Sequence, residues 1–286
     1  MKNLVLRIWL AALVVVLLSG CEKVLQEENE AVPSNANVVL KLSLYDDLPF
    51  DTRGTQAVTE LCSRLNIGFF LNGTKVKTVA QKQGDEAFGT VGVVLEEGTY
   101  EVVVIAHNCE GSATITSTEK VTFPNNVVSD TFYYYGTLHV GTSQSTYNLE
   151  LKRAVAMFRL QLSESLPTAA KKIRFYYTGG SSTFCPLTGF GNVNSRQTVM
   201  LDVVSEQQTY EVYTFPHEET DELKILVSIY DEKNDILKEL TFEKVPVTLN
   251  RITQYRGDLM GGASVASSNL SLTGNSEWDG SDSYAF

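Results

Sequence analysis

Four cysteines are the residues of this 286-residue chain best suited to covalent chemistry, and one stands apart by its position. Cys21 follows an apolar run at residues 9–18, which itself follows a short segment with two positive charges. A charged segment, an apolar core and a pair of small residues are the parts of a secretory signal peptide. We therefore expect residues 1–20 to be removed and the thiol of Cys21, as the new N-terminus, to carry lipid. An ordinary signal peptide with a chance cysteine beside its cleavage site is the alternative.

The other thiols and the imidazoles lack the spacing of a metal site. They occur singly along the chain, without a Cys-x-x-Cys pair, so we expect neither a metal nor a cofactor. They belong to Cys62, Cys109, Cys185, His107, His139 and His217. An oxidising compartment would allow one disulfide, and we favour a bond between Cys62 and Cys109 within one domain. A thiol left unpaired is expected to be buried.

No arrangement of nucleophile, base and acid is recognisable in the sequence. The Gly-x-Ser-x-Gly, P-loop and His-Glu-x-x-His motifs are missing, and the carboxylates are spread along expected turns. Two of those carboxylates could still meet as a glycosidase pair, although solvated loop charges are the simpler interpretation. We therefore expect a protein that is not an enzyme.

Three consecutive tyrosines, Tyr133, Tyr134 and Tyr135, could serve a binding function. On a strand the first and third share one face, where an aromatic pair can stack on a sugar ring. We favour packing against a sheet, with the hydroxyls at the rim. A surface glycan-binding lipoprotein of a nutrient-uptake system is the alternative function. Trp278, the only tryptophan beyond the signal peptide, lies near the C-terminus and argues against a multi-aromatic sugar platform.

Charge excludes one class of partner. Loss of residues 1–20 removes Lys2 and Arg7 and no acidic residue, so the net charge falls from −11 to about −13. An acidic chain without a basic patch is not suited to nucleic acid. Residues 21–34 are polar and acidic, and we expect a flexible tether that resembles the acidic export signals of surface lipoproteins in Bacteroidia.

The rest of the chain has a β texture. Many short segments with alternating or continuous apolar residues recur about every ten residues, with helical turns expected only at 60–65 and 166–170. Two groups of about seven strands indicate an all-β fold of two tandem antiparallel sandwiches, at 35–151 and 152–262. A Gly/Ser-rich tail with an aromatic tip, expected to be flexible, follows at 263–286. The expected strands are 37–45, 65–71, 75–80, 91–95, 99–106, 115–123, 131–135, 146–151, 154–162, 172–178, 198–204, 209–215, 223–230, 236–242 and 252–260.

Three of these segments resemble one protein family, the FimB-like anchor subunits of Bacteroidia fimbriae. Residues 149–160 resemble its domain-junction strand, in which a basic residue precedes a Val-Ala pair. Residues 247–260 resemble its closing strand, and 95–106 resemble a Gly-Thr-Tyr hairpin that opens an apolar strand. The resemblance covers roughly residues 35–260 and rests on architecture and on the cysteine of the signal peptide.

This resemblance implies transthyretin-like domains and a structural role in cell adhesion. In the family, a shaft subunit donates an extended strand to its neighbour, and a lipid-bound anchor ends the filament at the outer membrane. The resemblance therefore implies fimbrial shaft subunits as partners by donor-strand exchange, and a surface-exposed, lipid-anchored location. Arg53, in a polar loop, resembles the arginine cleavage sites of shaft precursors, although we expect a plain loop arginine because an anchor need not be cut.

Overall fold

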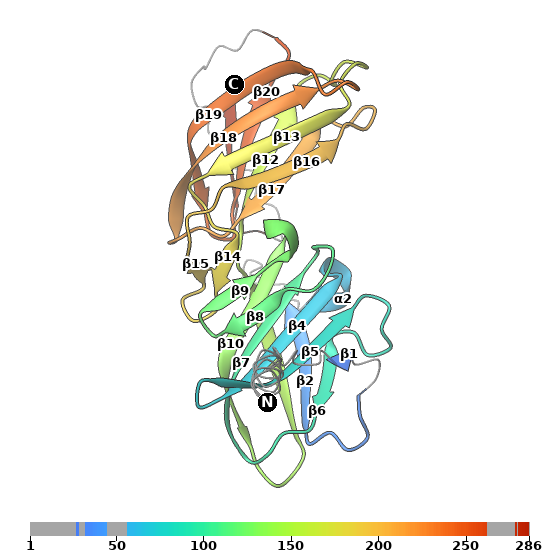
Figure 1. Cartoon of the computed structure of the whole chain (residues 1–286), viewed down its shortest axis with the longest axis vertical. Helices are drawn as coiled ribbons and strands as arrows, with labels where there is room; N and C mark the ends of the chain where they lie inside the picture. Colours follow the sequence, from blue (N-terminus) through green and yellow to red (C-terminus); the bar gives the residue numbers. More distant parts are fainter. Residues whose placement is uncertain (1–26, 29–31, 45–55, 262–277, 279, 286) are drawn as a thin grey trace, which may run out of the picture.

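The computed structural model describes residues 27–28, 32–44, 56–261, 278 and 280–285, and it is built almost entirely of β-strands (Figure 1). Its helical parts are α2 (Val58–Leu61) and the short 3-10 helix η2 (Pro124–Asn126). The prediction of an all-β sandwich fold is confirmed. Among the described residues, no helix is both long and apolar enough to cross a membrane.

The first group of strands, which we call the N-terminal lobe, forms one sheet that wraps around a core. The strand order is β1-β5-β4-β7-β10-β11-β2-β3, and β6 also pairs with β2. The strands are β1 (Glu27–Glu28), β2 (Val38–Leu44), β3 (Gln56–Ala57), β4 (Arg64–Leu71), β5 (Thr74–Lys82), β6 (Thr90–Val93), β7 (Gly98–His107), β10 (Thr131–Val140) and β11 (Ser145–Arg153).

The second group, the C-terminal lobe, packs two four-stranded sheets against each other, in the orders β17-β12-β20-β21 and β16-β13-β18-β19. Its core is separate from that of the first lobe and is formed by residues between Ala156 and Leu259. The strands are β12 (Ala156–Leu162), β13 (Lys172–Thr178), β16 (Gln197–Asp202), β17 (Thr209–Thr214), β18 (Thr220–Tyr230), β19 (Ile236–Thr248), β20 (Ile252–Gly257) and β21 (Ser281–Ala285).

Alternating apolar side chains explain why these segments form strands with one face buried. In β2, Val38, Leu40, Leu42 and Leu44 are buried, while the residues between them are more exposed. That period of two is the signature of a strand with one face on a core. The Asn72-Gly73 turn has positive φ at both residues, as the predicted hairpin between β4 and β5 requires.

A third sheet joins the two lobes. Its order is β15-β14-β9-β8, formed by β8 (Thr114–Ser117), β9 (Lys120–Thr122), β14 (Thr183–Cys185) and β15 (Phe190–Gly191). Strand β9 pairs with β14 across the junction, and a mixed apolar cluster from both lobes packs beside this pair. The expected boundary between residues 151 and 152 falls inside β11, and it stays a prediction.

Several expectations about single elements were wrong. Residues 115–123 are not one strand, because the Ser117 hydroxyl accepts a hydrogen bond from the Glu119 amide and turns the chain between β8 and β9. The helical turn expected at 60–65 lies earlier, in α2, and 166–170 holds no helix. The tether and tail are not wholly without structure, because β1 pairs with β5 and β21 pairs with β20.

The favoured disulfide is also absent, since Cys62, Cys109 and Cys185 are all free and buried. Cys62, at the end of α2, packs into the core of the N-terminal lobe, whereas Cys109 packs into the cluster at the lobe junction. The Cys109 thiol donates to the Val127 carbonyl and the Ser129 hydroxyl at 3.2 Å. The two thiols thus belong to cores on different sides of the sheet, which keeps them apart.

Candidate interaction site between two diverging strands

The predicted lipidation site, Cys21, and the loop residue Arg53 both lie outside the described residues. Within the described part of the chain, no three His, Cys, Asp or Glu side chains come together as a possible metal site. The candidate binding site is instead formed by the edges of two neighbouring strands.

The start of β10 lies beside the end of β11, and away from this point the two antiparallel strands diverge. They pair only at Phe132 with Arg153 and at Tyr133 with Lys152. Beyond these pairs β10 stays on β7, while β11 pairs in parallel with β2. Among the described strands, none occupies the edges that β10 and β11 turn toward each other. We call this opening the fork, and the two residue pairs its apex.

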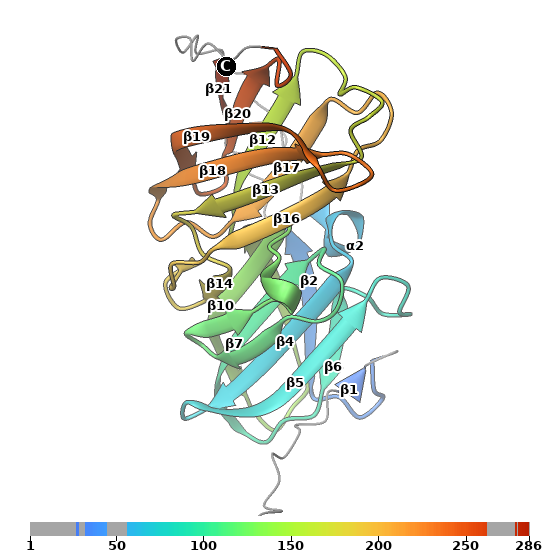
Figure 2. The same cartoon turned by 45° about the horizontal axis from the view of Figure 1, so that its top comes forward.

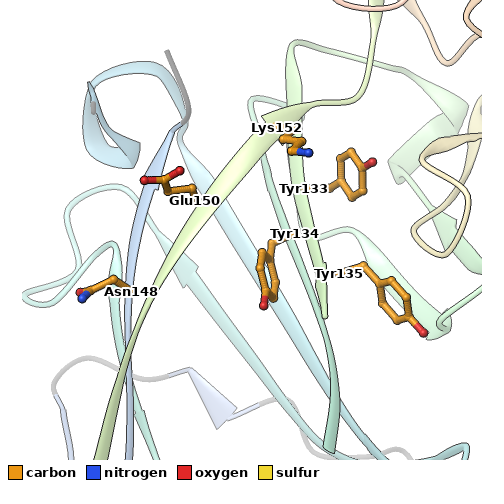
Figure 3. A pocket seen from close by; sticks show the side chains of 6 residues that line it. All are labelled: Tyr133, Tyr134, Tyr135, Asn148, Glu150 and Lys152. Carbon is orange, nitrogen blue, oxygen red and sulfur yellow. The ribbon is translucent and has the colours of Figure 1, made fainter. Parts of the chain in front are cut away.

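A cavity of about 400 Å³ lies at the fork (Figure 3). Tyrosines of β10 and exposed polar residues of β11 meet there, so the walls are half aromatic and half polar. Unpaired strand edges beside a cavity form a template for an added strand. The lining residues are Tyr133, Tyr134, Tyr135, Asn148, Glu150 and Lys152.

The three tyrosines are partly buried and divide between two faces of β10 (Figure 3). Tyr133 packs edge-on against Phe184 of the C-terminal lobe, with ring centroids 4.8 Å apart. The Tyr135 hydroxyl donates a hydrogen bond to Glu101, which raises the pKa of Tyr135 to about 12. The tyrosines therefore pack against their neighbours, as expected from the sequence, and the three rings do not form a flat exposed platform for a sugar.

Tyr134, on the other face, packs against the core of the N-terminal lobe and lies over Gly136. A Cβ atom at Gly136 would come within 2.4 Å of the Tyr134 hydroxyl oxygen. A larger residue at this position would therefore have to displace the Tyr134 ring from its place beside the fork.

A buried arginine holds the apex. The Arg153 side chain donates to both Asp130 carboxylate oxygens, at 2.8 and 3.0 Å, and to Asn250 Oδ1 at 3.1 Å. Its guanidinium lies over the Phe132 ring on one side and the Trp278 ring on the other. Arg153 thus links both lobes and the C-terminal segment.

The two lobes share one topology, which the fork interrupts. In the N-terminal lobe the order β6-β2-β11 faces β5-β4-β7-β10, and in the C-terminal lobe β17-β12-β20 faces β16-β13-β18-β19. In both, the first strand pairs in parallel with the last, β2 with β11 and β12 with β20. On its other edge β20 carries β21, also in parallel (Figure 2). The corresponding edge of β11 is the one that faces the fork.

A family model described as fimbrillin-A associated anchor proteins Mfa1 and Mfa2 matches residues 20–260. The chain belongs to this family. The predicted resemblance to fimbrial anchor subunits is therefore confirmed, and the match spans both lobes.

Solved structures similar to this anchor-family protein come from Parabacteroides, Porphyromonas and Bacteroides. A fimbrial assembly protein from Parabacteroides distasonis is 12% identical, with a TM-score of 0.39 over 77% of this chain and 89% of that chain. The fimbrial anchor protein Mfa2 from Porphyromonas gingivalis is 10% identical, with a TM-score of 0.38 over 71% and 80%. A candidate adhesin from Bacteroides ovatus is 17% identical, with a TM-score of 0.45 over 79% and 87%. No curated protein matches the sequence.

Membership in the anchor family gives this protein a structural or adhesive role in a fimbria at the bacterial surface, in association with the outer membrane. The prediction that it is not an enzyme is confirmed on the same ground.

Sequence reasoning missed several residues of the site in this anchor-family protein. Arg153 was part of the junction motif, but nothing in the motif showed that Asp130 and Trp278 would enclose it. Gly136 could have been noticed as a glycine inside an apolar strand, which often marks a close approach. The fork itself depends on which strands pair, and a pattern of period two carries no such information.

Proposed function

We propose that this protein is the lipid-held anchor of a fimbria and that the fork receives an extended segment of the neighbouring fimbrial subunit. The observation that carries the proposal is the difference between equivalent edges. The edge of β20 is covered by β21, whereas the corresponding edge of β11 faces a cavity.

The geometry of β21 indicates how such a segment would bind. It pairs with β20 in parallel, from Ile252 with Ser281 to Arg256 with Ala285. An equivalent segment in the fork would run parallel to β11 and satisfy the free N–H and C=O groups of its edge. Alternate side chains would point toward the core beside Tyr134 and Leu138, so we expect a short strand with alternating apolar residues.

The proposed lipid at Cys21 would fix the orientation of the molecule. Strand β1 lies on β5 of the N-terminal lobe, and Glu27 is six residue steps along the chain from Cys21. Six residues span at most about 20 Å, so the N-terminal lobe would lie next to the membrane. Several acyl chains on one cysteine would make this attachment durable.

The decisive experiment deletes the gene and restores it with single variants. In the deletion strain, shaft subunits should still be made, but filaments should be shed or change in length, because the membrane end is no longer held. Cys21→Ala should give the same phenotype and release a folded protein from the membrane fraction. Glu150→Trp should place a bulky side chain in the fork and weaken assembly, while Glu222→Trp, at an exposed position of β18, should not.

Purified mature protein should bind a synthetic peptide that copies the donor segment of its shaft subunit. Glu150→Trp should weaken that binding, and Glu222→Trp should leave it unchanged. Micromolar binding of a polysaccharide together with normal fimbriae on the deletion strain would contradict the proposal and support the glycan-binding alternative.

A further inference from the structure

A residue that is far away in sequence lies at the apex of the fork. Trp278 is 7% exposed, and the Arg153 guanidinium carbon lies 3.9 Å from the centre of its ring. On the opposite side the same carbon lies 4.6 Å from the Phe132 ring. Phe132 and Arg153 form one of the two residue pairs that join β10 to β11. The tryptophan thus completes a stack in which the arginine is the middle layer.

This stack also protects an ion pair. The Arg153 side chain is 4% exposed and that of its partner Asp130 is 19% exposed. Removal of the indole ring would admit water to the guanidinium, and an ion pair weakens as the local dielectric rises. A cation over an indole face is attracted more strongly when the pair is shielded from water than when it is exposed.

The segment that brings Trp278 to the apex is held by contacts that can be released. Strand β21 has five residues at the edge of its sheet, and Tyr284 stacks on Tyr255 with centroids 4.8 Å apart. The ion pair between Arg251 and Asp282 is longer, at 3.4 Å, and about a quarter exposed. The exposed ion pair itself contributes little to stability, and a short edge strand opens more readily than the middle of a sheet, so this segment can open locally while the two lobes stay folded.

We propose that the described C-terminal residues, Trp278 and 280–285, act as a strap that controls the fork through Arg153. With the strap in place, Trp278 holds Arg153 against Phe132 and keeps the apex paired. When the strap leaves, Arg153 becomes solvated, the apex pairs loosen, and β10 and β11 separate further. The coupling is reciprocal, so a segment that wedges the apex apart would weaken the hold on Trp278.

The apex does not open completely when the strap leaves. The Ala154 amide still donates to the Thr131 carbonyl at 2.8 Å, next to the last residue pair. The strap therefore adjusts the width of the fork and does not separate the lobes. This control matters for assembly only if the fork receives a subunit, as proposed above.

Hydrogen exchange on the full mature protein tests the strap without any partner. Trp278→Ala should speed the exchange of backbone amides at the two apex pairs, 132–133 and 152–153, by about tenfold, which corresponds to ~1.4 kcal/mol. Trp278→Phe, which keeps an aromatic face, should restore most of the protection. Amides of β13 and β18 should exchange as in the wild type.

A matched control separates the strap from a general loosening of the lobe junction. Phe215 is fully buried in the same apolar cluster, and its ring packs at a tilt against the rings of Phe123 and Phe184. Phe215→Leu should leave the apex less affected than Trp278→Ala does. Equal acceleration in both variants, or no acceleration in Trp278→Ala, would overturn the proposal.

A double-mutant cycle tests whether the effect passes through the arginine. Arg153→Lys keeps the charge beside Asp130 but loses the flat guanidinium that stacks between the rings. Adding Trp278→Ala to Arg153→Lys should then accelerate apex exchange less than it does in the wild type. Full additivity would contradict the strap. None of these readouts involves a shaft subunit, so their failure would leave the proposed anchor function untouched.

Discussion

The two lobes arrange seven equivalent strands in the same order, but they differ in the pairing of one strand edge. In the C-terminal lobe the outer edge of β20 is paired with β21, and Tyr255 is covered by Tyr284. In the N-terminal lobe the equivalent edge of β11 pairs with β10 at its last two residues only, and Tyr134 folds over Gly136 of its own strand. A sandwich of this topology therefore has one position for an eighth strand. Strand β21 fills that position in the C-terminal lobe, whereas no described strand fills it in the N-terminal lobe.

Removal of residues 278–286 should make the C-terminal lobe resemble the N-terminal one. The loss of a buried tryptophan alone costs ~3–5 kcal/mol, and the uncovered β20 edge adds a tendency to associate. We expect a fall of at least that size in the free energy of unfolding, measured by denaturant titration, and a dimer or larger species by light scattering. A synthetic peptide of residues 278–286 should restore part of the stability by binding the folded state.

An unchanged free energy of unfolding and a monomer after this truncation would show that β21 does not complete the lobe. The comparison between the filled and the open edge would then fail. If the truncated protein is destabilised but the peptide does not rescue it, β21 stabilises the lobe only when it is part of the same chain.

Acid should destabilise the N-terminal lobe through a buried histidine without an equivalent in the other lobe. His107 Nε2 donates to Asn66 Oδ1, and Nδ1 accepts from the Cys109 amide, so the ring is bound as the neutral form. Burial lowers the pKa of His107 to about 4, with a further contribution from the Arg64 charge. In the unfolded chain His107 has an ordinary pKa near 6.5, so between pH 6.5 and 4 the unfolded chain binds a proton at His107 and the folded protein does not.

Stability should therefore fall as the pH drops from about 6.5 to 4, by about 3 kcal/mol from this residue. Above pH 6.5 the contribution is constant. The measurement is the pH dependence of the free energy of unfolding in the wild type and in His107→Gln. Parallel curves for the two proteins would show that His107 does not cause the acid sensitivity.

The smallest effect is expected from the glycine under Tyr134. Gly136→Ala should push the Tyr134 ring away from β10 and cost ~1–3 kcal/mol, as overpacking does. Gly141→Ala, in the connection between the same strands, meets nothing within 4 Å and should be nearly neutral. Equal stability of the two variants would show that Tyr134 does not need its glycine.

The sequence predicted what depends on local patterns. Alternation located most strands, as in β2, and the Asn72-Gly73 turn located a hairpin, because both signals lie within a few neighbouring residues. The resemblance at 149–160 indicated the family, but nothing local could show that Trp278 reaches Arg153 from 125 residues away. The contacts of the C-terminal residues could not be predicted for a related reason. The Gly/Ser-rich composition of the tail describes the average of the segment and not the contacts of Trp278 with Arg153 and of Tyr284 with Tyr255.

The sheet that joins the lobes has a mechanical consequence. Thr183 pairs with Thr122 and Phe184 with Val121, and the mixed cluster packs beside these pairs. Bending one lobe against the other would have to break backbone hydrogen bonds and open an apolar interface at the same time. A pull on the C-terminal lobe is therefore transmitted to the N-terminal lobe as a load and is not absorbed by a hinge. Any extension under load of a filament attached to this protein must therefore come from segments outside the two lobes.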